Sequence, residues 1–269
     1  MKTGSRVGNL GQRVLIAVVG IPLILATFYF SSWMLIAAVI LTVAATLEML
    51  SLWGTGKSVP NLIVPLLTAI LLPVIFHFFP GRYDLILALI LTTSLLALLV
   101  ELFRNGSDSL RTTAIYYHLT WFAIIPLSLL VPLRQQLHGD QILLVVFLTA
   151  WGIDSGAYFV GKSFGRHKFF PSISPKKTVE GWAGGTAVGL LVVWGCSFFM
   201  DLTPLTLWST GGAVLLLGPA GDLVESRFKR AAGVKDVSRF LPGHGGFLDR
   251  FDTITLALPA IYLLQLLKP

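Results

Sequence analysis

The sequence predicts an all-α, polytopic integral membrane protein with about nine transmembrane helices and two long cytoplasmic loops. Hydrophobic residues make up 55% of the 269 residues and charged residues only 12%, whereas ordinary globular domains carry roughly 25% charged residues. The mean hydropathy is +0.79. Apolar stretches of about 20 residues recur along the chain, which is the length that crosses a hydrocarbon core ~30 Å thick. This composition excludes a soluble globular protein.

Each predicted span is an apolar stretch that ends at polar or turn-forming residues. The turn between the first two spans is Ser31-Ser32, and Gly56 to Pro60 leads into the third. Pro80 to Arg82, Arg104 to Arg111 and Arg134 to Asp140 separate the next three pairs. The nine predicted spans are Val14–Phe30, Trp33–Trp53, Asn61–Phe79, Tyr83–Phe103, Thr112–Leu133, Gln141–Val160, Gly181–Met200, Leu205–Leu223 and Thr253–Leu267.

The distribution of basic residues predicts the orientation of these spans. If the N-terminus is cytoplasmic, only Arg82, Arg134 and Lys268 of the 20 basic residues fall on the outer side. Cytoplasmic loops of membrane proteins carry an excess of Lys and Arg. We therefore expect a multi-pass plasma (inner) membrane protein with a cytoplasmic N-terminus and an outer C-terminus. Because the basic residues lie between spans, the net charge of +7 points to anionic lipid or nucleotide phosphate and away from nucleic acid.

The chain divides into an N-terminal scaffold, residues 1–140, and a C-terminal catalytic region, residues 141–269. The two long polar loops, residues 161–180 and 224–252, both lie in the second part and are both predicted to be cytoplasmic.

Acidic residues near the cytoplasmic ends of spans are candidate site residues, because a carboxylate inside a membrane is unfavourable and usually functional. For Glu48 and Glu101 we favour an interfacial acid paired with a loop cation. Asp154 lies about two turns inside its span between Gly152 and Gly156, whose spacing suits close helix packing but does not account for the acid. Gly181, Gly185 and Gly189 form a similar small-residue stripe, for which we also expect helix packing.

Asp222 is the strongest of these candidates. Gly218-Pro219 precedes it, and a proline removes a backbone hydrogen bond, so we expect the helix to break beside this acid. Irregular backbone at that depth is tolerated where it is buried in protein or lines a wet cavity. A break beside a carboxylate would therefore mark a site.

The first long loop combines cations with small polar residues. Lys176 and Lys177 follow Ser174-Pro175 directly before a predicted helix start, so we assign Ser174, Lys176 and Lys177 to substrate binding. Attraction of the cations to anionic headgroups remains an alternative for each of them.

The second loop mixes cations that suit phosphates with carboxylates that suit a metal. Asp222 and Ser226 share a face if the helix resumes, and Asp249 and Asp252 would share another. Hard oxygen ligands select Mg²⁺, Ca²⁺ or Mn²⁺ over zinc. We expect Asp222 and Asp249 to hold Mg²⁺ or Mn²⁺ with Asp252 or Asp154 assisting, and a second cation is an open possibility. The proposed phosphate grips and substrate contacts are Lys229, Arg230, Arg250, Ser226, Lys235, His244, Gly245 and Gly246.

The residues from about Trp151 to Asp252 resemble the phosphatidate cytidylyltransferases, also called CDP-diacylglycerol synthases. The first loop is similar to that family in Asp154, Ser174 to Lys177 and Glu180-Gly181. The second loop matches its signature in identity and spacing at Ser226, Lys229-Arg230, Lys235-Asp236, Ser238, Leu241-Pro242, His244-Gly245-Gly246, Asp249-Arg250 and Asp252. The resemblance implies CTP and phosphatidic acid as substrates, CDP-diacylglycerol and pyrophosphate as products, a divalent metal and a homodimer.

Two other functions are compatible with parts of this pattern. A second CTP-using membrane enzyme, such as a polyprenol kinase, would transfer the γ-phosphoryl group instead. A secondary transporter would use Asp154 and Asp222 along a cation pathway, but such proteins often contain repeated halves with paired broken helices. The N-terminal half of this sequence has no Gly-Pro-acid element to match Gly218 to Asp222.

Overall fold

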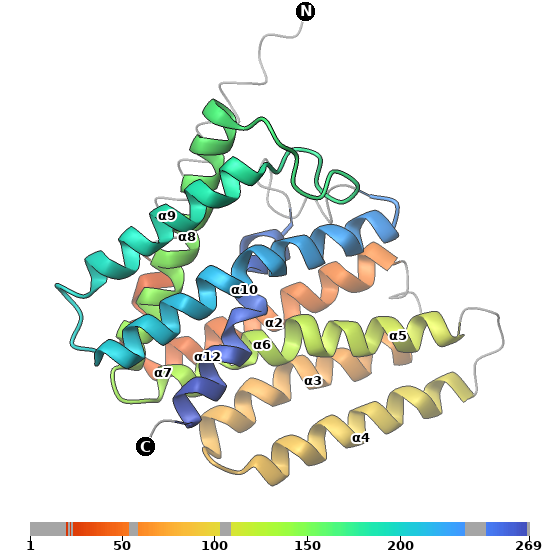
Figure 1. Ribbon diagram of the computed structural model, residues 1–269. Coiled ribbons are helices and arrows are strands. Elements are labelled where there is room, and N and C mark those ends of the chain that lie inside the picture. Colours follow the sequence, from red (N-terminus) through yellow and green to blue (C-terminus); the bar gives the residue numbers. More distant parts are fainter. Residues whose placement is uncertain are drawn as a thin grey trace, which may run out of the picture.

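The protein is an all-α, polytopic membrane protein, as predicted. The computed structural model describes residues 20, 22, 24–53, 59–102, 109–234 and 246–267. Within these ranges the chain is helical apart from its connections and one isolated β-bridge between Lys168 and Thr178. The elements (Figure 1) are α2 Ser31–Trp53, α3 Val59–Phe78, α4 Tyr83–Leu102, α5 Ser109–Leu119, the π-helix η1 Thr120–Ile124, α6 Ile125–Ser128, α7 Leu130–Arg134, α8 Gly139–Phe164, α9 Val179–Cys196, α10 Pro204–Ala231, the 3₁₀-helix η2 Leu248–Arg250, α11 Asp252–Thr255 and α12 Ala257–Leu266.

Six helices in the described part of the chain are long and apolar enough to cross a membrane, so the count of nine is not confirmed. These are Ser31–Trp53, Tyr83–Val100, Thr112–Arg134, Gly139–Phe164, Val179–Cys196 and Pro204–Ala231. Two further apolar helices, Leu62–Phe78 and Asp252–Leu266, are shorter. The first predicted span, Val14–Phe30, lies largely outside the described residues. Within that span, residues 24–29 are described and helical.

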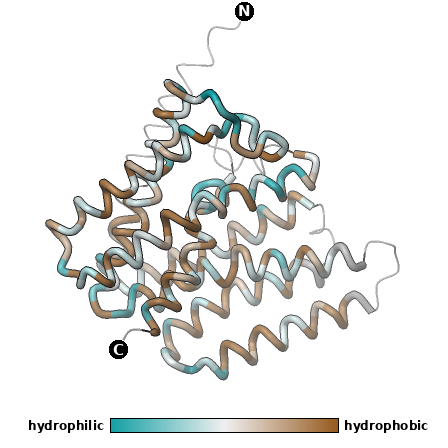
Figure 2. Tube along the Cα trace, in the orientation of Figure 1, coloured by the Kyte–Doolittle hydropathy of each residue, from teal (hydrophilic) through white to brown (hydrophobic). Residues whose placement is uncertain are grey.

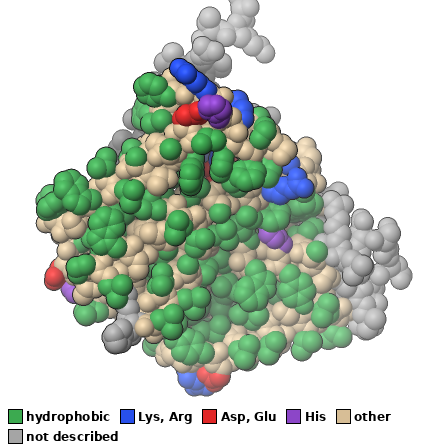
Figure 3. Space-filling model, in the orientation of Figure 1, with side chains coloured by type: hydrophobic (Ala, Val, Ile, Leu, Met, Phe, Trp, Pro, Cys, Tyr) green, Lys and Arg blue, Asp and Glu red, His purple; other side chains and the backbone are tan. Residues whose placement is uncertain are grey.

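The apolar surface of the bundle fits this membrane assignment. Figure 2 shows hydrophobic residues along most of each helix, and Figure 3 shows hydrophobic side chains over most of the face that it draws. On α4, Leu87, Leu91 and Leu95 are each more than half exposed. Lys, Arg, acidic and His side chains lie at the edges of this face: over the connection between α8 and α9 at the top of the view, and in smaller groups at its left and lower edges. A large exposed apolar surface with charged side chains at its edges suits a lipid environment.

The predicted break at Gly218-Pro219 is wrong, because α10 continues through Pro219 as one helix from Pro204 to Ala231. A proline fixes φ at a value that a helix already uses and removes only one hydrogen bond, and α3 likewise contains Pro65 and Pro73. The prediction that this span ends at Leu223 is also wrong, because the helix continues to Ala231. The start of the predicted 224–252 loop is therefore helical.

Two other predicted spans are interrupted. The helix predicted over Thr112–Leu133 contains the π-helical turn η1, in which the N–H of Ile125 bonds to the carbonyl of Thr120. This turn lies just before Pro126, which cannot donate a backbone hydrogen bond. The span predicted over Thr253–Leu267 divides into α11 and α12. Pro259 cannot bond to the carbonyl four residues earlier, which belongs to the last residue of α11.

The glycine stripes of α8 and α9 form a close helix seam, as predicted. A Cβ added to Gly156 would lie 2.8 Å from the carbonyl oxygen of Gly184, and one added to Gly185 would lie 2.7 Å from that of Ile153. Backbone atoms cannot rotate away from such a contact, so only glycine permits this separation. The seam fixes the connection between the two helices, which extends over the C-terminal end of α10 (Figure 1).

The two parts of the chain pack against each other. Helix α2 contacts η2, α7 contacts α8, and α12 contacts α6. Their buried side chains, among them Met34, Leu72, Leu127, Leu143 and Leu258, belong to one hydrophobic core. The division at residue 140 stays a prediction.

Gly185→Ala is expected to destabilise the protein by about 1–3 kcal/mol, because the added methyl group meets the Ile153 carbonyl. Gly195→Ala is the matched control on the same helix. A Cβ at Gly195 meets nothing within 4 Å, so this change should be neutral or slightly stabilising through the better helix propensity of alanine. Thermal unfolding in detergent micelles measures both, and equal melting temperatures would contradict the tight seam.

Candidate active site

One face of α10 carries the charged residues of the candidate site. Asp222, Glu225, Ser226 and Lys229 follow the three- and four-residue spacing that places side chains on one helix face. Ser226 and Asp222 share a face as predicted, since the Ser226 hydroxyl lies 3.4 Å from Asp222 Oδ1 and can donate to it. Because α10 extends to Ala231, Lys229 and Arg230 are held by a helix and not by a loop.

Lys177 joins the first loop to α10 through an ion pair with Asp222. The lysine is 29% exposed and the aspartate 30% exposed. The turn before it is ordered as expected, because the N–H of Lys177 donates to the carbonyl oxygen of Ser174 at 3.2 Å. Thr178 then caps α9 by accepting a hydrogen bond from the N–H of Gly181. The cap and the turn place Lys177 at a defined position.

Arg230 also connects these two segments. Its Nε donates to the carbonyl oxygen of Ile173 at 3.2 Å and its Nη1 to that of Val234 at 3.1 Å. In this structure its guanidinium therefore supports the loop that carries Lys177. Its predicted grip on phosphate stays a prediction.

A second lysine–carboxylate pair lies further along α10. Lys229 pairs with Asp249 of η2, and its Nζ lies 3.4 Å from Oε1 of Glu225. These side chains are largely buried, with exposures of 12% for Lys229, 16% for Asp249 and 1% for Glu225. The N–H of Gly246 donates to Asp249 Oδ2 at 2.8 Å. Burial raises the pKa of Asp249, but its polar contacts, among them those with Lys229 and the N–H of Gly246, hold the pKa below its ordinary value.

Asp252 is buried beside this pair. The prediction that Asp249 and Asp252 share a helix face is wrong. The chain leaves helical geometry at Phe251, with φ −124° and ψ −1°. Asp252 Oδ1 instead accepts hydrogen bonds from the backbone N–H and the hydroxyl of Thr253, at 2.6 and 3.2 Å. The residue is 8% exposed.

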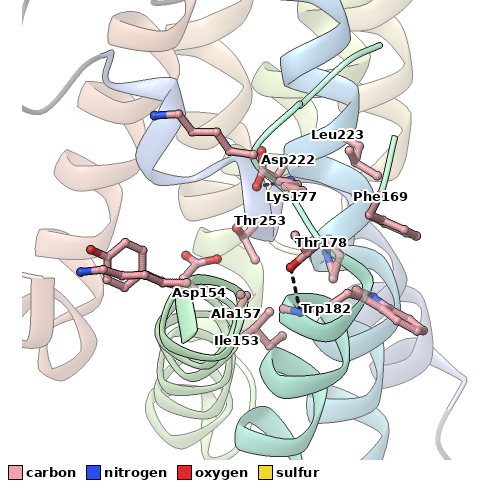
Figure 4. A pocket seen from close by; sticks show the side chains of 16 residues that line it. Ile153, Asp154, Ala157, Phe169, Lys177, Thr178, Trp182, Asp222, Leu223 and Thr253 are labelled. Carbon is pink, nitrogen blue, oxygen red and sulfur yellow. Dashed lines mark hydrogen bonds and ion pairs between the residues drawn. The ribbon is translucent and has the colours of Figure 1, made fainter. Parts of the chain in front are cut away.

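A cavity of ≈ 390 Å³ lies between α8, α9, α10 and the first loop. Asp154, Lys176, Lys177 and Asp222 line it together, and Figure 4 shows the pair of Lys177 and Asp222 on its wall. The apolar part of the lining consists of Ile153, Ala157, Phe169, Trp182, Pro219 and Leu223. The cavity therefore combines charged groups that suit a phosphate with a surface that suits apolar groups, and its volume is typical of a small-molecule site.

The predicted site residues are brought together only in part. Lys235, His244 and Gly245 lie outside the described residues, so their assignments stay predictions. Ser174 shapes the loop turn but does not line the cavity, and Arg250 is exposed at the end of η2. Gly246 is buried against the carboxylate of Glu48, where an added Cβ would lie 2.8 Å from Oε1.

Two further acidic residues lie in this region. Glu225 was not singled out, although its position three residues after Asp222 indicated the same helix face. For Glu48 the expected pairing with a loop cation stays a prediction. Its side chain is 5% exposed and accepts hydrogen bonds from the N–H groups of Phe247 and Leu248. Backbone donors carry no sequence signal, so this contact could not be found from residue types.

The described acidic residues do not form a closed metal cage. In the described part of the chain, no three His, Cys, Asp or Glu residues are grouped closely enough to hold an ion. Asp222 and Asp249 are each paired with a lysine. Mg²⁺ commonly uses one or two carboxylates, several waters and substrate phosphates, and its assignment to Asp222 and Asp249 stays a prediction.

These observations define a multi-pass membrane protein with a cavity between its helices that is lined by charged and apolar side chains. The sequence profile of the cytidylyltransferase family matches residues 11–267. The chain therefore belongs to the cytidylyltransferase family.

Curated relatives carry a more specific name. The chain is similar to the phosphatidate cytidylyltransferase of Staphylococcus aureus (strain COL), with 47% identity over 129 residues. The match covers 47% of this chain and 49% of that protein. The phosphatidate cytidylyltransferase of Staphylococcus haemolyticus (strain JCSC1435) is 46% identical over 129 residues, with the same coverage. The match thus spans about half the length of these relatives.

Asp249→Asn is expected to destabilise the protein at pH 7 by about 1–3 kcal/mol, the range for losing a hydrogen bond to a charged group. The folded-state pKa of Asp249 lies below its ordinary value, so the carboxylate stabilises the fold above the unfolded pKa. This contribution is lost as the pH falls below about 4 and passes through the lowered pKa. Thermal unfolding should therefore show a gap between wild type and variant that narrows on acidification. A gap independent of pH would contradict the ionised pair.

Proposed function

We propose that the protein is a phosphatidate cytidylyltransferase, which converts CTP and phosphatidic acid into CDP-diacylglycerol and pyrophosphate. The observation that carries the proposal is the cavity in which Lys176, Lys177, Asp154 and Asp222 face an apolar wall between membrane helices. A phospholipid headgroup needs such a combination, because its phosphate is charged and its adjoining chains are apolar. The family match and the names of the two relatives agree with this function.

The reaction is a nucleotidyl transfer that needs little acid–base chemistry. A phosphate oxygen of phosphatidic acid attacks the α-phosphorus of CTP, forming a new P–O bond. The bond between the α-phosphorus and the bridging oxygen breaks, and pyrophosphate leaves with the electron pair. The second pKa of a phosphate monoester is about 6, so the nucleophile is already largely ionised at neutral pH. The protein must mainly hold two anions together.

The two lysine pairs suit that task. Lys177 and Lys229 are each fixed by a carboxylate, so their ammonium groups are positioned before substrate arrives. Fixed charges in a site of low polarity stabilise developing charge more effectively than mobile ones in water. Lys176, Arg230, Arg250 and Lys235 would add to the grip on the CTP phosphates or the phosphatidate headgroup, and His244 and Gly245 would contact substrate.

Asp222 and Asp249 would hold a divalent cation, Mg²⁺ or Mn²⁺, with Asp252 or Asp154 assisting, and a second cation is part of the proposal. The ion would supply neutralisation of phosphate charge. The excess of basic residues on one side of the spans supports a cytoplasmic site in a plasma (inner) membrane. A homodimer is likewise proposed from the resemblance, and nucleic acid is not a proposed partner.

Purified protein in micelles containing phosphatidic acid and Mg²⁺ should move label from the α-phosphate of CTP into the lipid fraction. Asp222→Asn and Asp249→Asn should each reduce this transfer by at least about a hundredfold, the scale of losing one preorganised electrostatic contact. Asp201→Asn is the control, because Asp201 is exposed on the connection between α9 and α10.

The other outcomes separate the rival functions. Label that reaches lipid only from the γ-phosphate would identify a polyprenol-kinase type of reaction. Cation flux into liposomes without any turnover of CTP would identify a transporter. Full transfer by both folded aspartate variants would remove those acids from the site.

A further inference from the structure

Glu48 is a buried acid for which the proposed reaction has no use. It lies near the C-terminal end of α2 and is 5% exposed. A buried carboxylate is strongly unfavourable unless hydrogen bonds compensate for the lost water. Glu48 finds them in a segment about 200 residues away in the sequence, at the turn that leads into η2.

The Glu48 carboxylate makes a bidentate contact with two successive backbone N–H groups. Oε1 accepts from the N–H of Phe247 at 2.6 Å, and Oε2 accepts from the N–H of Leu248 at 2.7 Å. Each oxygen thus has its own donor, and hydrogen bonds to an ionised acceptor are short and strong. The grip fixes the position and direction of two successive peptide groups.

Gly246 allows this close approach. A Cβ at that position would lie 2.8 Å from Oε1, 3.1 Å from Cδ and 3.2 Å from Oε2 of Glu48. A side chain there would push the carboxylate away from the two N–H groups. This contact inside the protein accounts for a glycine at position 246, and the predicted substrate contact of Gly246 stays a prediction.

The same turn orients Asp249. The N–H of Gly246 donates to Asp249 Oδ2 at 2.8 Å, and Lys229 pairs with Oδ1. The peptide that carries this N–H precedes the one that donates to Glu48. The turn is therefore held from one side by α2 and from the other by α10.

We propose that Glu48 is a positioning residue for Asp249, acting through the backbone of residues 246–248. The proposal rests on the proposed function only for its activity readout. It gives the N-terminal part of the chain a direct role in the site, beyond that of a scaffold.

The test compares Glu48→Gln, Glu48→Asp and Asp84→Asn in the full-length protein in micelles. Glutamine keeps the shape but loses the charge, and its NH₂ group cannot accept from a backbone N–H. Asp84 is the matched control because it is an acid in the same part of the chain, exposed and paired with Arg82.

The first readout is hydrogen exchange of peptides covering residues 246–250, which needs neither substrate nor metal. Exchange should be about tenfold to a hundredfold faster in Glu48→Gln, the range for losing a hydrogen bond to a charged group. Exchange elsewhere, and in Asp84→Asn, should match wild type. Unchanged exchange at 246–250 in folded Glu48→Gln would overturn the proposal.

The second readout is turnover at saturating CTP, measured as transfer of the α-label. It should fall in Glu48→Gln by about tenfold to a hundredfold and recover in part in Glu48→Asp, which restores the charge. Faster exchange without any loss of turnover would show a purely structural contact and overturn the positioning role. If Glu48→Gln does not fold, Gly246→Ala disrupts the same contact, because its Cβ would displace the Glu48 carboxylate. This variant should also show faster exchange at residues 246–250 and reduced turnover.

The two proposals fail separately. If wild-type protein transfers no label, the proposed function fails while the exchange experiment still tests the grip of Glu48 on the turn. If wild type is active and Glu48→Gln is indistinguishable from it, only the positioning role fails.

Discussion

The structure depends on keeping charged groups paired where membrane helices meet. A charge inside a bundle in lipid needs a partner of opposite charge or several hydrogen bonds. Helix α10 meets this requirement with Lys229, which faces Glu225 and Asp249, and with Asp222, which faces Lys177. These pairs join α10 to the first loop and to η2. The elements that the pairs hold together also carry the proposed substrate contacts, so the proposed function would use side chains that also stabilise the fold.

Much of the fold follows from hydropathy alone. The predicted spans Trp33–Trp53, Asn61–Phe79 and Tyr83–Phe103 correspond closely to α2, α3 and α4, because long apolar stretches have few alternatives in a membrane. The prolines of this chain differ in their effect on the helices. Helix α10 is continuous through Pro219, whereas Pro126 and Pro259 accompany interruptions. Whether a proline interrupts a helix depends on its neighbours in space, which one sequence does not show.

Contacts between side chains of the candidate site could be predicted from the sequence, but contacts made by backbone N–H groups could not. Lys177 lies in the first loop and Asp222 in α10, yet the sequence indicated both as candidate site residues because of their charges. The grip of Glu48 on Phe247 and Leu248 involves peptide groups that every residue possesses, so residue identity gave no indication of it. The sequence also indicated Gly246, but the contact that requires a glycine there is with Glu48 of α2. The family match extends over residues 11–267, and the structure adds the contact by which Glu48 of α2 reaches the turn before η2.

The central claim is that the Lys177–Asp222 pair takes part in the reaction and does not only hold the first loop to α10. Exchanging the two charges, as Lys177→Asp with Asp222→Lys, tests this most directly because it restores an ion pair with the chemical roles reversed. The account predicts that the double variant recovers thermal stability relative to each single variant, while transfer of the α-label from CTP to lipid remains lost. Recovery of both stability and transfer would contradict it and reduce the pair to a structural contact.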